Sequence, residues 1–261
     1  MMKIFVFSDN INIFKAIYKI LRSLDYNIDY FCSPESKQIF KEFTFIKPKN
    51  IKSNYEVLLS YDLGFSIHSK QIFPNILVEK VLCINLHPGY NPHNRGIYPQ
   101  SFSIINKLPI GATLHIMDSN IDSGDIIEQI QVKIEPFDTS LSLYKKILRA
   151  EIKLFKKNIH NILNHNFKVK KLKTKGNYNS KRDFCDLCRI DLEKTITMQE
   201  ALDYLRALSH KPHNNAYFID ANGNKVYVRL EIRNPKNNIE KLDMGGGSRV
   251  NLPSPFLQRS A

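Results

Sequence analysis

The sequence predicts an α/β protein with a mostly parallel sheet flanked by helices, followed by a small module of one helix and a β-hairpin. Through the first 165 residues, short apolar segments alternate with segments of helical periodicity, which is the pattern of a parallel sheet with crossover helices. Residues 81–87 form a nearly continuous apolar run, as strands do when both faces of a sheet are covered. Near the C-terminus, Asn222-Gly223 lies between two strand-like segments and predicts a hairpin turn.

The order of elements follows from periodicity. Apolar and β-branched content predicts strands at 3–8, 27–33, 55–61, 63–67, 81–87, 110–117 and 125–134. Apolar residues at helical spacing predict helices at 10–26, 35–43, 99–108, 141–163 and 197–208. The stretch FDT, residues 137–139, is a good N-cap neighbourhood for the helix at 141–163, whereas Pro74 breaks residues 71–80, which we expect to be a connection. The hairpin pairs 216–220 with 225–232.

These elements predict three regions along the chain. We expect a catalytic domain at 1–166 and the helix-and-hairpin module at 167–244. We expect a flexible tail at 245–261, where a glycine run without periodicity has the composition of a fusion remnant.

Composition indicates a globular chain. Its 261 residues and hydrophobic content of 43% are enough to bury a substantial core. No apolar run approaches the ~18 residues of a membrane span. The opening MMKIFVFSDN is too short for a secretory signal and predicts a first strand instead, so we expect a cytoplasmic protein.

The net charge of +13 is densest in KVKKLKTKGNYNSKR, residues 168–182. We interpret this run as a solvated linker, because charged runs are commonly exposed. The alternative is an anion site for a nucleotide, a phosphate or a nucleic acid. On that alternative the chain would be a non-catalytic nucleotide- or RNA-binding protein with strongly salt-dependent affinity.

Two ligand motifs are absent or incomplete. The turn FSDNINIF has no glycine, which argues against a G-x-G-x-x-G dinucleotide site, although Asn10 can cap the helix or bind a ligand there. Cys185-x-x-Cys188 and His210-x-x-His213 hint at zinc, but the gap between the histidines is shorter than zinc sites use. We expect no metal.

Polar side chains pointing the same way end the strand at 81–87. Asn85 and His87 are two positions apart, and Asp122 and Asp125 follow about thirty-five residues later, in a loop between two strands. An imidazole can accept a proton from an attacking amine, and an amide N–H can donate to a developing oxyanion. A carboxylate can fix the imidazole's tautomer. Meeting at the carboxyl ends of parallel strands, these groups would form a site for acyl transfer to an amine.

The longer pattern NLHPGYNPHNRGIYP…SIINKLPIGATLHIMDSNIDSGDII resembles the folate-dependent formyltransferases. Members of that family have Asn-x-His-Pro at a strand end, then a proline-bearing loop ending in Arg-Gly and Pro. A Gly-x-Thr strand and an Asp before a Gly-Asp or Gly-Gly turn follow. The matching residues here, in order, are Asn85, His87, Pro88, Arg95, Gly96, Pro99, Gly111, Thr113, Asp122, Gly124 and Asp125. The match is strong over 83–130 and looser over 1–165.

The resemblance implies a Rossmann-like formyltransferase fold, N10-formyltetrahydrofolate as the formyl donor and an amine as the acceptor. It also implies a catalytic triad of Asn85, His87 and Asp122, and a pterin pocket lined by the loop 116–121. The residues expected to contact the folate are Ile116, Met117, Asp118, Ile121 and Asp125, the last of which is also expected to hold the turn.

Three kinds of acceptor compete within this resemblance. Members acting on glycinamide ribonucleotide have a glycine- and serine-rich loop after the first strand, from which FSDNIN departs. Methionyl-tRNA members carry a C-terminal β-barrel, for which residues 166–244 are too few, although the positive charge would suit a tRNA. Sugar N-formyltransferases of similar length end in a helix and hairpin often used in dimer contacts, and RALSHKPHNNAYFIDANGNKVYV looks like that module.

We therefore predict a sugar N-formyltransferase acting on a dTDP-linked amino-dideoxysugar, for example dTDP-4-amino-4,6-dideoxyglucose, in O-antigen, lipopolysaccharide or other surface polysaccharide synthesis. A methionyl-tRNA formyltransferase-like enzyme is the alternative. We expect a homodimer that binds a nucleotide-linked amino sugar, without a nucleic acid or membrane partner. DLGFSIHSKQIF looks like the loop in which such enzymes bind a pyrophosphate. The residues expected to contact the substrate are Asn10, Ser69, Lys70, Tyr90 and Arg95.

Overall fold

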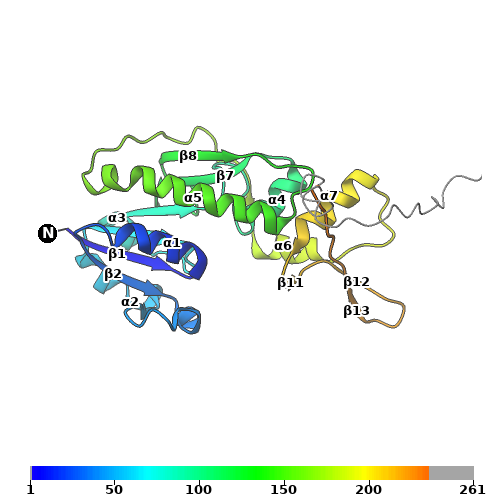
Figure 1. Ribbon diagram of the computed structural model, residues 1–261, viewed down its shortest axis with the longest axis horizontal. Helices are drawn as coiled ribbons and strands as arrows, with labels where there is room; N and C mark the ends of the chain where they lie inside the picture. The colour runs from blue at the N-terminus through cyan, green and yellow to red at the C-terminus, as the bar shows by residue number, and fades with distance from the viewer. Residues whose placement is uncertain (1, 235–261) are drawn as a thin grey trace, which may run out of the picture. The chain divides into compact units, whose positions relative to one another are not determined.

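The computed structural model describes residues 2–234, and its centre is a seven-stranded sheet (Figure 1). The strands are β1 Lys3–Ser8, β2 Asn27–Cys32, β3 Lys47–Pro48, β4 Leu63–Ile67, β5 Leu82–His87, β7 Ile110–Ile116 and β8 Ile126–Val132. Their order across the sheet is β3-β2-β1-β4-β5-β7-β8. The first five are parallel, whereas β7 runs antiparallel to both β5 and β8. The predicted mostly parallel α/β fold is confirmed.

Successive side chains of β1 enter different cores, because alternate residues of a strand face opposite sides of a sheet. Ile4 and Val6 pack on one face with α1 (Ile11–Leu21) and α5 (Ser140–Leu163). Phe5 and Phe7 pack on the other face, which is covered by α2 (Ile51–Asn54), the 3-10 helix η2 (Glu56–Ser60) and α3 (Asn75–Lys80). Helices packed on both faces hold the sheet in place, including its carboxyl edge, where the candidate site lies.

Side-chain caps begin the two helices that cover the first face. The Oδ1 of Asn10 accepts hydrogen bonds from the N–H groups of Asn12 and Ile13 and caps α1 without any glycine. Thr139, in the predicted N-cap neighbourhood, caps α5: its Oγ1 accepts from the Ser142 N–H, and Ser142 Oγ accepts from the Thr139 N–H in a capping box.

Three local predictions are corrected. Residues 55–61 are not a strand: residues 56–60 form the 3-10 helix η2. Leu58 is buried there, whereas Val57 and Leu59 are exposed. Residues 71–80 are not a plain connection, since Pro74 stands at the position before α3, where its fixed φ starts a helix. The helix expected at 35–43 is the 3-10 helix η1, Pro34–Phe40.

The C-terminal part contains the predicted helix and hairpin together with elements the sequence did not indicate. α7 spans Met198–Leu208 and packs on α4, Pro99–Asn106. The hairpin is β12 Tyr217–Ile219 with β13 Lys225–Tyr227, and Gly223 has a positive φ in its turn. α6, Lys181–Cys188, was not predicted, and neither were the short strands β10 Ser209–His210 and β11 His213–Asn214.

Residues up to Glu231 pack as one compact unit, so a domain boundary at 166/167 stays a proposal. The tail predicted at 245–261 lies outside the described residues. Within residues 2–234, no helix combines the length and the apolar content that crossing a bilayer requires.

The lysines of residues 168–179 are exposed, as expected of a solvated segment, but the segment is paired with other strands at both ends and is not a free linker. We call residues 168–179 the basic strap. Figure 1 shows the segment after α5 running beside β8, and the backbones of Lys170 and Ile126 exchange two hydrogen bonds there. Its end, β9 (Tyr178–Asn179), pairs in parallel with β6 (Arg95–Gly96) in the proline-bearing loop. Periodicity in the sequence could not predict this pairing, because β6 and β9 are each only two residues long.

Candidate active site

The predicted triad residues meet at the end of β5. Asn85 Nδ2 lies 3.0 Å from Asp122 Oδ1 and donates a hydrogen bond to it. His87 Nδ1 lies 3.5 Å from the same oxygen, and the side chains of His87 and Asp122 are only 5% and 10% exposed. An amide, an imidazole and a carboxylate therefore share one small, largely dry space.

The three side chains meet through a strand arrangement that differs from the expected one. The sequence suggested carboxyl ends of parallel strands, but β7 is antiparallel to β5, and Asp122 lies in the β7–β8 loop. This register places His115 opposite Asn85 and Thr113 opposite His87. A second buried histidine thereby joins the site, and the sequence reasoning missed it. The signal was present in IGATLHI, where Thr113 and His115 alternate as Asn85 and His87 do.

The hydrogen bonds of His115 define its tautomer. Its Nδ1 lies 2.8 Å from the carbonyl oxygen of Ile116, which can only accept, so Nδ1 carries the proton. Its Nε2 then accepts from Asn85 Nδ2 at 3.2 Å. Both N–H groups of the Asn85 amide are therefore engaged, one with Asp122 and one with His115. Donation to a substrate oxygen requires one of these bonds to be exchanged.

The Asp122 carboxylate and its backbone are held independently. The Gly96 N–H donates to Oδ2 at 3.2 Å, and Asn91 Nδ2 donates to the Asp122 carbonyl at 2.9 Å. Asp122 has a φ of 51°, in the left-handed region that aspartate and asparagine tolerate better than most residues. In the same turn, a Cβ at Gly124 would overlap the carbonyl oxygen of Ile116, so the close approach requires glycine.

His87 is buried with one nitrogen unengaged. Among the described residues its Nε2 has no hydrogen-bond partner, and a Cβ at Gly89 would overlap that atom. Burial lowers the pKa of His87 to about 4, against the opposing attraction of the Asp122 charge. The imidazole is therefore neutral at neutral pH, with a lone pair available to accept a proton.

The pKa of Asp122 is set by opposing effects. Burial raises it, but the positive charges that His87 and His115 carry when protonated, a hydrogen bond from protonated His115, and the Gly96 N–H together hold it below its usual range. The carboxylate is thus ionised wherever the protein is folded near neutral pH.

The loop after β5 is fastened by polar side chains. Thr113 Oγ1 donates to the Gly89 carbonyl at 2.8 Å and accepts from the Asn91 N–H at 3.2 Å. Gln129 Nε2 donates to the Asn91 carbonyl and to Thr113 Oγ1, both at 2.9 Å. Hydrogen bonds from β7 and β8 therefore hold this proline-bearing loop in place.

Asn94, which had no role in the sequence reasoning, joins this loop to the basic strap. It is fully buried with a φ of 48°. Its N–H donates to Asn177 Oδ1 at 2.8 Å and its Nδ2 to Ser103 Oγ at 2.9 Å. Its Oδ1 accepts from the side chains of Asn106, Asn177 and Asn179.

The residues predicted to contact folate lie in and around the β7–β8 loop. Ile116 ends β7, and its N–H donates to the backbone carbonyl of Asp125. The Met117 N–H donates to the Cys83 carbonyl. Asp118 Oδ1 accepts from the Asn120 N–H and from Ser123 Oγ, and Ile121 is 38% exposed. Their contact with a pterin stays a prediction.

Asn10 and the two predicted phosphate-loop residues lie at the ends of β1 and β4. Asn10 Nδ2 donates to Tyr144 at 2.7 Å and lies 3.3 Å from His68. Ser69 Oγ donates to the Gln71 carbonyl, so it stabilises its own loop. The exposed Lys70 places its Nζ 3.4 Å from Ser36 Oγ.

Tyr90 and Arg95 lie in the proline-bearing loop. Tyr90 forms a bridge with His93, and Arg95 Nη1 donates to the Ile121 carbonyl at 2.6 Å. Arg95 Nε is buried and has no hydrogen-bond partner among residues 2–234.

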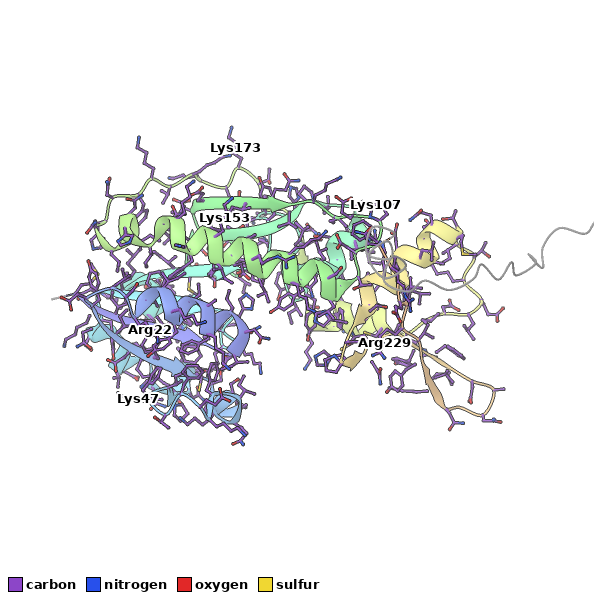
Figure 2. All side chains as sticks on the ribbon, viewed as in Figure 1. Arg22, Lys47, Lys107, Lys153, Lys173 and Arg229 are labelled. Atoms are coloured by element: carbon purple, nitrogen blue, oxygen red, sulfur yellow. The ribbon has the colours of Figure 1, made fainter. Side chains whose placement is uncertain are left out.

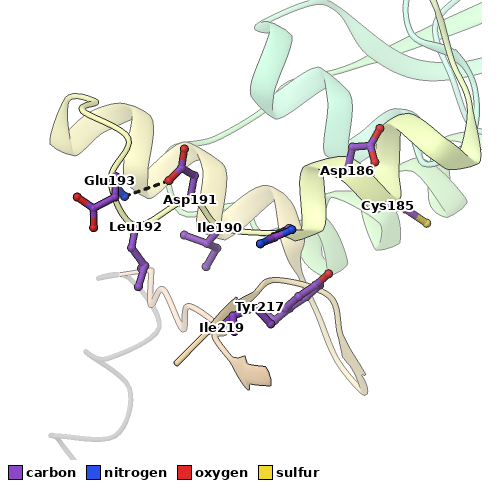
Figure 3. A pocket seen from close by; sticks show the side chains of 9 residues that line it. Cys185, Asp186, Ile190, Asp191, Leu192, Glu193, Tyr217 and Ile219 are labelled. Carbon is purple, nitrogen blue, oxygen red and sulfur yellow. Dashed lines mark hydrogen bonds between the residues drawn. The ribbon is translucent and has the colours of Figure 1, made fainter. Parts of the chain in front are cut away.

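Two cavities are found within residues 2–234, one near the proline-bearing loop and one in the C-terminal part. One of about 580 Å³ lies between Arg95, the 119–123 loop and the strap. Another of about 800 Å³ lies in the C-terminal part between α6 and β12 (Figure 3), and no triad residue lines either cavity. Cys185 lines this second cavity, and His210 instead lies 3.0 Å from Ser140 Oγ on α5. The described residues contain no cluster of metal-ligating side chains.

Comparisons with known proteins agree with this geometry. Residues 63–159 match the Formyl transferase family, and residues 183–234 match the N-formyltransferase dimerization C-terminal domain. The dTDP-4-amino-4,6-dideoxyglucose formyltransferase of Mycobacterium tuberculosis is 42% identical over 181 residues, covering 69% of this chain and 77% of that protein.

Solved structures give the same result. A 4-N formyltransferase from Francisella tularensis is 52% identical with a TM-score of 0.87, covering 89% of this chain and 98% of that one. A sugar N-formyltransferase from Shewanella sp FDAARGOS_354 is 39% identical with a TM-score of 0.80 and the same coverage. The chain therefore belongs to the formyltransferase family and is a folate-dependent N-formyltransferase. The recognition made from the Asn-x-His-Pro pattern is confirmed, and sugar amines are the class of acceptor that these relatives support.

Proposed function

We propose that this chain transfers the formyl group of N10-formyltetrahydrofolate to the C4 amine of a dTDP-linked 4-amino-4,6-dideoxysugar, in the synthesis of O-antigen or another surface polysaccharide. The observation that carries the proposal is the buried, neutral His87, whose Nε2 is unpartnered within the described residues beside the ionised Asp122. The names of the Mycobacterium tuberculosis and Francisella tularensis relatives support the C4 position over C3.

In the proposed mechanism, side chains of this protein transfer the amine proton and stabilise the negative charge that develops on the formyl oxygen. As the amine nitrogen bonds to the formyl carbon, His87 Nε2 accepts the amine proton. Asp122, 3.5 Å from His87 Nδ1, holds that nitrogen's proton toward itself and stabilises the imidazolium. Asn85 exchanges its bond to His115 for one to the oxygen that becomes negative. The imidazolium then returns its proton to the departing nitrogen.

The residues near His87 fit a polar ligand such as a folate. Three buried atoms of the described chain lack partners, His87 Nε2, Asn91 Oδ1 and Arg95 Nε, and all belong to β5 and the loop that follows it. Buried polar groups in folded proteins are normally satisfied, so a bound molecule with both donors and acceptors is the expected complement. Ile116–Ile121 would form the wall beside it.

The nucleotide is proposed to lie toward the ends of β1 and β4. Lys70 is exposed there, with Ser36 beside its ammonium group and the buried Asp9 accepting its backbone N–H at 2.7 Å. A fixed lysine next to a hydroxyl is suited to a diphosphate oxygen.

The assembly is proposed to be a homodimer formed through the C-terminal part. The matching family domain at 183–234 is described by its dimerization role. Leu192, Met198 and Tyr227 in this region are large apolar side chains that are 61%, 76% and 52% exposed, which favours burial against a second copy. We also propose that the enzyme acts in the cytoplasm, without a nucleic acid or membrane partner.

Incubation with N10-formyltetrahydrofolate and a panel of dTDP-linked 3-amino and 4-amino dideoxysugars tests the activity. We expect tetrahydrofolate to form with a 4-amino sugar and the product to gain one formyl group by mass. No turnover with any of them, together with tight salt-dependent RNA binding, would support a binding protein instead. Formylation of methionyl-tRNA would support the tRNA alternative.

A further inference from the structure

We propose that the basic strap binds the acidic tail of the folate, so that the enzyme prefers donors carrying several γ-linked glutamates over the monoglutamate. The inference rests on the proposed function, because it concerns the donor of that reaction. It assigns a role to Lys173 and Lys175, which the proposed chemistry does not use.

The strap is held in place at both ends. Lys170 exchanges backbone hydrogen bonds with Ile126 on β8, at 2.9 and 2.8 Å. At the other end, Asn177 and Asn179 bind the buried Asn94, and β9 pairs with β6. The lysines between these anchors are therefore positioned at a fixed edge of the site rather than spread along a flexible linker.

The cavity beneath the strap is suited to carboxylates. Its polar lining residues are Arg95, Ser119, Asn120, Ser123, Lys173 and Lys175, with Thr174 and Tyr178 beside them. No acidic side chain is among the described residues that line it. Figure 2 shows Lys173 projecting outward from the strap, where it can meet a tail leaving the cavity.

The lining of this cavity includes the chain neighbours of the triad, although no triad residue lines it. Ile121, in its lining, immediately precedes Asp122, and Arg95 immediately precedes Gly96, whose N–H donates to Asp122. Arg95 has a buried Nε without a partner among residues 2–234. In a folate, N10 is the amino nitrogen of the p-aminobenzoyl group, so only one benzoyl unit separates it from the first glutamate. A donor reacting at His87 must therefore release its tail close to the triad, which is where the cavity lies.

The length of the basic run favours a chain of carboxylates over a single diphosphate. Residues 168–175 contain five lysines and no acid. Each further glutamate adds one carboxylate to the tail, so a tail of several glutamates can meet both cavity-lining lysines, Lys173 and Lys175. The diphosphate already has a separate proposed contact in Lys70, at the ends of β1 and β4.

The test compares 5-formyltetrahydrofolate with one and with three glutamates, by calorimetry at about 50 mM salt with the full-length protein. We expect the triglutamate to bind about three- to tenfold more tightly, and the difference to shrink as salt rises, since exposed charges are screened. Lys173→Glu/Lys175→Glu should abolish the difference. The matched control, Lys168→Glu/Lys171→Glu, changes the same charge on the same strap outside the cavity lining and should preserve it.

Equal affinities for the two folates in the unaltered protein would overturn the strap's role and leave the proposed function intact. A difference that survives Lys173→Glu/Lys175→Glu, or one that both double variants lose alike, would also overturn it. If Lys173→Glu/Lys175→Glu weakens a dTDP-sugar and not the triglutamate, the strap binds the nucleotide and the inference is wrong. Failure of both folates to bind would overturn the folate-dependent function itself.

Discussion

Asn85 and Asp122, 37 positions apart in the chain, are joined by a 3.0 Å hydrogen bond from amide Nδ2 to carboxylate Oδ1. The same oxygen lies 3.5 Å from His87 Nδ1 and 3.6 Å from His115 Nε2. One carboxylate oxygen thus organises three side chains from two antiparallel strands. Changes at Asp122 should therefore affect both the proton acceptor and the amide.

Asp122→Asn isolates the carboxylate charge. Asparagine tolerates the φ of 51° and has the same shape, so the fold should be kept. Without the charge the imidazolium formed during reaction is not stabilised, and we expect kcat to fall by ~10²–10⁴-fold. Steady-state kinetics with circular dichroism measures this. A variant within a few-fold of the parent would show that Asp122 does not act through its charge.

His87→Asn removes the proton acceptor. Turnover should fall by ~10²–10⁴-fold while folate affinity changes little, because proton transfer matters only as the transition state forms. His165→Asn is the control, since His165 is exposed beyond α5 and its φ of 51° suits asparagine. The proton-acceptor role would be refuted by equal effects of the two substitutions on kcat.

His115 is proposed to position Asn85. His115→Phe keeps the ring volume but leaves one N–H of Asn85 without an acceptor, and we expect kcat to drop about tenfold, ~1.4 kcal/mol, with KM nearly unchanged. His115→Gln can accept the same bond and should recover most of the loss. A glutamine variant as impaired as the phenylalanine variant would argue for a role of the imidazole itself.

The low pKa of His87 predicts a pH dependence of stability. Its folded-state pKa is about 4 against an ordinary 6.5, so between these values the unfolded chain binds more protons. Stability is fully present above pH 6.5 and is lost as the pH falls toward 4, by up to roughly 3 kcal/mol from this group. Urea unfolding at pH 7, 6 and 5 should show a shallower loss for His87→Asn than for the parent. Parallel losses would mean that His87 titrates normally.

Asn94→Ala should loosen the strap. The substitution leaves the half-buried amide of Asn177 and the buried amide of Asn179 without this acceptor and puts alanine at a positive φ. We expect about 2–4 kcal/mol of lost stability. In a protein of this size that lowers Tm by about 5–10 °C. Asn222→Ala, in the exposed hairpin turn, is the control. Thermal unfolding and proteolysis near residue 175 are the measurements, and an unchanged melting curve would exclude Asn94 as an anchor.

The sequence predicted the sheet and the triad because each leaves a local signal. The Val81–His87 run, the helical spacing in α1 and α5, and the two-residue alternation of Asn85 and His87 are all readable within a few neighbours. His115 was missed because its importance comes from the register of β7 on β5, which a strand pattern alone does not specify. The strap was missed because its partners are 44 and 83 residues away: Lys170 pairs with Ile126, and Tyr178 with Arg95. The strand-like composition of 55–61 misled because strand propensity depends on packing, and Val57 and Leu59 are exposed in a 3-10 helix.

The pairing of β6 with β9 has a consequence for the order in which the site forms during synthesis. A nascent chain that has emerged only to the end of α5 already contains Asn85, His87 and Asp122, yet Arg95 and Gly96 still lack the strand that they pair with. The Gly96 N–H that holds Asp122 would be fastened only after residue 179 leaves the ribosome. Catalytic competence would thus come late in translation, well after every reacting group has been made.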